Sequence, residues 1–90
     1  MFFVLLSAIV ISGCAVKIRK IADLPYGTTF GDARRSAVAA ETWECMEMDH
    51  PAQRRMTMEC VSKDDRNDHL CYSFVDRNGL FILDEAGCAD

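Results

Sequence analysis

The stretch that decides the fold is Phe-Val-Asp-Arg-Asn-Gly-Leu-Phe-Ile-Leu, residues 74–83. Asn78 and Gly79 lie between two apolar runs, and Asn-Gly is the strongest short hairpin signal because both central residues of the turn need positive φ. The segment predicts an antiparallel hairpin between a strand at residues 69–76 and a strand at residues 80–84. With this turn, Val75 lies opposite Ile82 and Phe74 lies opposite Leu83.

Two more strands are predicted upstream, at residues 43–49 and 54–63, where the hydrophobic period changes to two. A turn at residues 50–53 centred on Ala52 pairs Met46 with Met58 and Met48 with Met56. Because paired residues point to the same side of a sheet, all four methionines are expected on one face. The polar cluster at residues 64–68 is the next turn, so the strands form a meander with regular spacing.

A helix is predicted before the strands, from Asp32 to about Thr42. Thr29 precedes Asp32 by three residues, which is an approximate capping box with an acidic residue in the first turn. The helix has a narrow face of small side chains and is expected to cover an aromatic sheet face. That face is formed by Trp43, Leu70, Tyr72, Phe74, Phe81 and Leu83. The expected fold class is α+β, with one N-terminal helix packed on a three- to four-stranded antiparallel β-meander that disulfides staple.

Five cysteines are present, at positions 14, 45, 60, 71 and 88. Cys14 belongs to the apolar N-terminal run, which leaves four cysteines in the rest of the chain. This even number is enough for two disulfides in an oxidising compartment. A second turn centred between residues 65 and 66 places Cys60 opposite Cys71 and favours that pair, which leaves Cys45–Cys88. Those two cysteines would start about 14 Å apart across the sheet. The alternative is Cys45–Cys60 with Cys71–Cys88.

Cys14 ends an uncharged apolar run that begins at Met1, and the four residues 11–14 read Ile-Ser-Gly-Cys. This pattern resembles the lipobox of bacterial lipoproteins, which implies cleavage before Cys14 and acylation of its sulfur. The expected organisation is a signal peptide at residues 1–13, a lipidated tether at 14–25 and a small disulfide-bonded domain at 26–90. The alternative is an uncleaved anchor, but sixteen helical residues span only about 24 Å of a hydrocarbon core about 30 Å thick.

The lipoprotein resemblance implies a location as well. Ala15 follows Cys14 where an Asp would favour retention in the inner membrane. The expected location is therefore the periplasmic side of the outer membrane, with the inner membrane second. The formal net charge of −4 argues against nucleic acid as a partner. The membrane and an envelope protein are the expected partners, and no cofactor is expected.

Residues 25–34 combine a Gly-x-Thr turn with a helix start that carries Asp32 and Arg34, ahead of a Trp-led antiparallel sheet. This resembles the small lipoprotein subunit of the outer-membrane β-barrel assembly machine and its relatives. The resemblance implies a helical pair packed on a three-stranded sheet and a scaffold role.

No catalytic constellation is recognisable, and an enzyme is not expected. His50 and His69 fall at turns without a nucleophile or carboxylate at motif spacing. The 64–68 cluster lacks the Gly and distal Glu of a calcium loop. The distinctive feature is the predicted methionine face (Met46, Met48, Met56 and Met58), and methionine is common at adaptable binding surfaces.

The leading hypothesis is a protein-protein interaction or scaffold module of the cell envelope, with no bound metal. One alternative is an exclusion or inhibitor lipoprotein of phage or plasmid type. Another is a Cu(I)-binding envelope protein that uses the methionines and His50, because thioethers suit soft metals.

Overall fold

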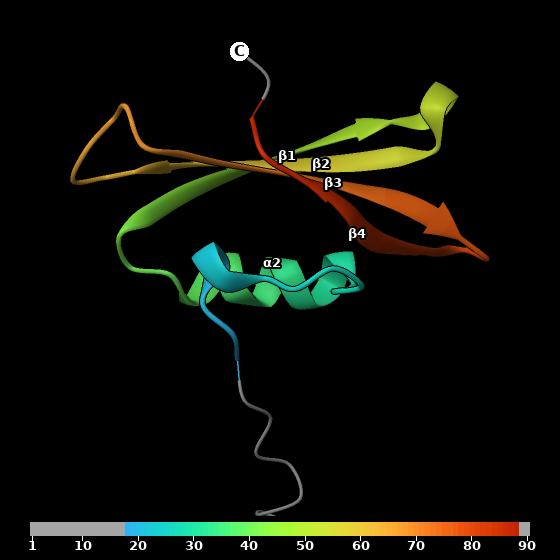
Figure 1. The fold of residues 1–90 in the computed structure, drawn as a ribbon, viewed down its shortest axis with the longest axis horizontal. Helices are drawn as coiled ribbons and strands as arrows, with labels where there is room; N and C mark the ends of the chain where they lie inside the picture. The colour runs from blue at the N-terminus through green and yellow to red at the C-terminus, as the bar shows by residue number, and fades with distance from the viewer. Residues whose placement is uncertain (1–17, 89–90) are drawn as a thin grey trace, which may run out of the picture.

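The computed structural model describes residues 18–88, and the lipobox with Cys14 lies outside them. A 3-10 turn, η1 (Ile21–Asp23), and an α-helix, α2 (Phe30–Ala39), precede four strands. The strands are β1 (Trp43–His50), β2 (Arg55–Ser62), β3 (His69–Arg77) and β4 (Leu80–Ala86), with a second 3-10 turn, η2 (Pro51–Gln53), between the first two. They form one antiparallel sheet in the order β1-β2-β3-β4. Figure 1 shows α2 and η1 together on one side of this sheet. The predicted α+β class with a disulfide-stapled meander is confirmed.

Helix α2 begins at Phe30, two residues before the predicted start at Asp32, directly after its cap residue Thr29. The Thr29 side chain accepts a hydrogen bond from the backbone N–H of Asp32 at 3.1 Å, which satisfies one of the free donors of the first turn. The helix ends at Ala39, three residues before the predicted end, because Ala40 is already extended.

The core lies between α2 and the inner face of the sheet. Phe30 meets Phe74 edge to face, with ring centroids 4.9 Å apart. Ala33 has no exposed surface, so the small side chains of the helix allow close approach to the sheet. The predicted aromatic face is the one the helix covers: Tyr72, Phe74 and Leu83 are buried, and Trp43, Leu70 and Phe81 pack around them.

The packed unit reaches further upstream than residue 26. Ile21 is 3% exposed and belongs to the core, and its carbonyl accepts a hydrogen bond of 2.7 Å from the Tyr72 hydroxyl. The predicted boundary between tether and domain therefore falls inside a segment that packs on the sheet.

The β3–β4 hairpin has the predicted register, with Val75 opposite Ile82 and Phe74 opposite Leu83. Asn78 and Gly79 both have positive φ, as a two-residue turn of this type requires. The Asp76 carboxylate accepts a hydrogen bond from the Gly79 N–H and closes the turn.

The predicted register of the first hairpin is wrong by one residue. Met46 lies opposite Glu59 and Met48 opposite Thr57, so the four methionines do not share a face. The reason is the loop: Arg54 adopts the left-handed conformation (φ 55°) and donates its N–H to the Pro51 carbonyl. Arg54 therefore belongs to the loop, and β2 starts one residue later. A one-residue slip moves every side chain of a strand to the other face.

The second hairpin is also shifted by one residue, because Cys60 lies opposite Leu70 and not opposite Cys71. The Ser62 hydroxyl accepts hydrogen bonds from the backbone N–H groups of Asp64 and Asp65, both at 3.2 Å. These local bonds fold the loop around Asp65. The centre of the loop therefore lies half a residue before the predicted centre between residues 65 and 66.

The register decides the disulfides, and the favoured prediction of Cys60–Cys71 with Cys45–Cys88 is wrong. Cys45 and Cys60 are directly opposite each other on the inner face and form one disulfide, with Cα atoms 4.0 Å apart. Cys71 on the outer face pairs with Cys88, with Cα atoms 4.9 Å apart. The alternative pairing is the one that forms, because no cysteine has to cross the sheet.

The hydrogen bond from the Tyr72 hydroxyl to the Ile21 carbonyl attaches η1 to the sheet, and its contribution to stability can be tested. Replacing Tyr72→Phe removes one buried hydrogen bond, and we expect a loss of about 1 kcal/mol of unfolding free energy at pH 8. Burial raises the pKa of Tyr72 above its ordinary value. Stability linked to this group is therefore full below about pH 10, the pKa of an unfolded tyrosine, and is lost as pH rises through the folded pKa.

The measurement is urea unfolding of both proteins at pH 8 and at pH 11. We expect the difference between wild type and Tyr72→Phe to shrink at pH 11, because only the wild type has this phenol to ionise. A difference that stays constant over this range would contradict the assignment.

Candidate binding face of the sheet

The outer face of the sheet, opposite the helix, contains an open hollow of about 350 Å³. Met46, Met48 and His50 alternate along β1 and all line it, together with Thr57 and Glu59 of β2. Met46 and Met48 are 64% and 54% exposed, whereas Met58 on the inner face is 1% exposed. Of the predicted methionine face, only Met46 and Met48 are brought together on an exposed surface; Met56 and Met58 face the core.

His50 is fixed by its neighbour on β2. Its Nε2 atom lies 3.0 Å from the Thr57 hydroxyl oxygen, and the ring is half-buried. In the tautomer that donates Nε2–H to Thr57, the Nδ1 lone pair is available to a ligand.

A charged cluster crosses the same face next to the hollow. Arg55 of β2 extends over β3, donates to the Ser73 hydroxyl at 2.7 Å and binds Asp84 of β4 through two hydrogen bonds of 2.8 Å. Asp84 is the extra residue of a bulge in β4, since Phe74 lies opposite Leu83 and Ser73 opposite Glu85. The hydrogen bonds from Arg55 lower the pKa of the Asp84 carboxyl.

The two edges of the sheet differ. The edge of β4 is partly covered, because Leu83 exchanges backbone hydrogen bonds of 2.8 and 3.0 Å with Thr28 and Gly27. The edge of β1 has no strand beside it in the part of the chain that the structure describes. Glu44, Glu47 and Asp49 lie along β1, and acidic residues of this kind discourage pairing with an identical edge.

The Glu47 side chain links this edge to the helical layer. Arg34 of α2 binds its carboxylate through two hydrogen bonds of 2.7 and 2.8 Å. These bonds lower the pKa of Glu47 and raise that of Arg34. Arg34 also lies over the Phe30 ring, 5.1 Å from its centroid.

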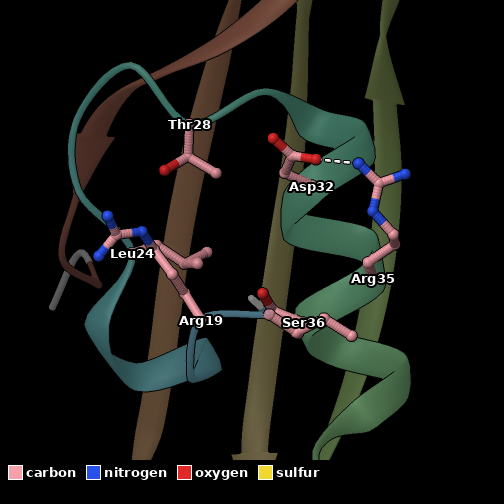
Figure 2. A pocket seen from close by; sticks show the side chains of 7 residues that line it. Arg19, Leu24, Thr28, Asp32, Arg35 and Ser36 are labelled. Carbon is pink, nitrogen blue, oxygen red and sulfur yellow. Dashed lines mark hydrogen bonds and ion pairs between the residues drawn. The ribbon is translucent and has the colours of Figure 1, made fainter. Parts of the chain in front are cut away.

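A second, smaller hollow of about 110 Å³ lies on the opposite side of the molecule, between the start of the described chain and α2. Figure 2 shows Arg19 and Arg35 on two sides of it, with Thr28 and Ser36 between them. Arg35 forms an ion pair with Asp32, and Ser36 is buried at 4% exposure. Sequence reasoning missed this hollow, because it depends on η1 packing beside the helix.

Two classes of site are not found between residues 18 and 88. No group of three or more His, Cys, Asp or Glu side chains there is arranged to hold a metal ion. None of the helices in this range is long and apolar enough to span a bilayer.

Comparisons of the sequence with protein-family models, with curated proteins and with solved structures find no match in any of the three. The fold also differs from the helical pair on three strands that the resemblance at residues 25–34 implies. Over the described residues it has one α-helix and four strands.

The Arg55–Asp84 pair makes an acid-stability prediction. The folded pKa of Asp84 is lowered, so the stability it contributes is present above about pH 3.9, the value for an unfolded aspartate, and is lost as pH falls through the folded pKa. We expect Asp84→Asn to be less stable than wild type at pH 7 and to match it near pH 2. Thermal unfolding between pH 2 and 7 measures this, and the exposed loop variant Asp64→Asn is the control. Equal destabilisation by the two variants at pH 7 would rule out the assigned role.

Proposed function

We propose that this protein is a lipid-anchored interaction module of the bacterial envelope. The Ile-Ser-Gly-Cys pattern at residues 11–14 supports the anchor. The two disulfides support maturation in an oxidising compartment, where thiols are converted to such bonds. The expected position is the periplasmic side of the outer membrane, held by acylated Cys14.

The observation that carries the interaction role is the open edge of β1 with Met46 and Met48 beside it. An exposed strand edge offers a row of backbone donors and acceptors to an added strand. Exposed methionines next to it supply adaptable apolar contacts. No packing requirement of the fold explains their exposure, since the core is complete on the other face.

The acidic residues along β1 select the kind of partner. Glu47 is ion-paired with Arg34 and Glu44 with Arg66, so the repulsion of a second copy of the same strand comes mainly from Asp49. The proposed partner is therefore an envelope protein that presents an extended segment with basic and apolar side chains.

The proposal is tested by photo-crosslinking from position 48 in cells. A photoreactive phenylalanine analogue in place of Met48 is expected to give a defined adduct with a membrane protein. The same analogue at Lys63, which is exposed in the loop after β2, should give none. A secreted chain that begins at Ala15, with neither the apolar run of residues 1–13 nor Cys14, should give no adduct, because it lacks the anchor that brings the module to its partner.

The intact mass of the membrane-extracted protein is measured first in this experiment. We expect loss of residues 1–13, acyl chains on Cys14 and two disulfides. A full-length chain with five alkylatable thiols would refute the anchor. Identical adducts from positions 48 and 63 would refute the interaction face while leaving the anchor intact.

A second function, binding of a soft metal such as Cu(I), is favoured by one observation. Met46, Met48 and His50 line one hollow, and all four described cysteines are bound in disulfides. Thioethers are thus the sulfur donors left between residues 18 and 88, and thioether and imidazole groups suit Cu(I). The flexible methionine side chains, two residues apart on one strand, can turn toward a common point beside His50.

Metal binding is tested by titrating the protein with Ag(I), a redox-inert stand-in for Cu(I), and with Cu(I) itself against a chromogenic competitor. We expect one ion per chain and at least a tenfold loss of affinity in Met46→Leu with Met48→Leu. The matched control is Met56→Leu, which changes the same side chain on the inner face. No uptake by the wild type, or an equal loss in the control, would eliminate this function.

A further inference from the structure

The chain leaves the described domain on the helical side. Residues 18–20 run away from η1 on the side of the helical layer that is remote from the sheet (Figure 1). Cys14 is four residues before Ile18, and a fully extended chain of four residues spans at most about 14 Å. If Cys14 carries acyl chains, the bilayer surface is close to this side of the domain.

The charge of the chain also differs between the helical layer and the sheet. Residues 18–42, which form η1 and α2, contain four basic and three acidic side chains, giving a formal net charge of +1. Residues 43–88, which form the sheet, contain five basic and ten acidic side chains, giving −5. A negatively charged surface repels the sheet and attracts the helical layer, because such fields act within about a Debye length of the membrane.

The exposed surface of the helical layer fits a lipid interface. Arg35 and Val38 project from α2 on the side opposite the buried Ala33, and Val38 is 82% exposed. Arg19 and Lys20 are exposed on the adjoining segment, next to Ile18, which is 52% exposed. Basic groups interleaved with apolar side chains are the composition that binds anionic headgroups at a membrane interface.

We propose that the helical layer is a membrane-contact surface, with Arg19, Lys20 and Arg35 against the phosphates of anionic lipid headgroups. Ile18 and Val38 lie at the interface, and the hollow between Arg19 and Arg35 faces the lipid (Figure 2). The outer face of the sheet, with Met46 and Met48, then looks away from the membrane. This orientation rests on the proposed lipid anchor, but the surface itself is testable without acylation.

The first test uses the acylated full chain in vesicles of phosphatidylcholine and phosphatidylglycerol, probed by hydroxyl-radical footprinting. We expect Ile18 and Val38 to be oxidised several-fold more slowly in these vesicles than in detergent. Met46 and Met48 are the internal control on the other face and should be oxidised at equal rates in both. Protection of Met46 and Met48 instead, or unchanged oxidation of Val38, overturns the orientation.

The second test uses a chain that begins at Ala15, which has neither the apolar run of residues 1–13 nor the sulfur of Cys14, and measures its partition onto the same vesicles. Near a charged membrane each basic residue adds binding energy that corresponds to about a fivefold change, so Arg19→Gln with Lys20→Gln should weaken partition about 25-fold. The matched control, Lys63→Gln with Arg77→Gln, removes two exposed charges from the loop after β2 and the end of β3 and should not weaken partition.

The outcomes separate the two proposals. A chain without acyl groups in cells that still partitions through Arg19 and Lys20 refutes the anchor and leaves the surface standing. An acylated chain whose partition is insensitive to both charge pairs, or equally sensitive to them, refutes the surface and leaves the anchor standing.

Discussion

The left-handed conformation of Arg54 is the constraint on which the two faces of the molecule depend. Because Arg54 closes the η2 turn, β2 starts at Arg55 and every pairing of the first hairpin follows from that start. Cys45 comes opposite Cys60 beneath the helix, and Met58 enters the core. The same register puts Met46 and Met48 on the open face, where no part of the fold needs them.

The elements were predictable from the sequence, whereas the register was predictable only where a turn has a unique chemical signature. Asn78-Gly79 has one, since both residues tolerate positive φ, and its hairpin forms as expected. An arginine in the left-handed region has no such signature, because it lacks both the freedom of glycine and the short polar side chain with which asparagine tolerates this conformation. The loop after β2 is set by hydrogen bonds to the Ser62 hydroxyl, and several loop lengths could satisfy those bonds.

The prediction of the candidate binding face was limited by the register in the same way. Composition identified methionine and His50 as its distinctive residues, but the assignment to faces required the register. The Arg55–Asp84 pair could not be expected at all, because it crosses β3 and depends on a bulge in β4. The contribution of Ile21 to the core was hidden for another reason: its element is a three-residue 3-10 turn, which is too short to establish a periodic signal.

The distribution of charge connects these features to a mode of action. An acidic sheet beside an anionic membrane is pushed outward, and a mildly basic helical layer at the point of attachment is drawn inward. In the proposed orientation, the open β1 edge is held at a distance from the lipid where another protein can reach it. In the proposed function, one charge pattern therefore orients the module and directs its binding edge away from the lipid.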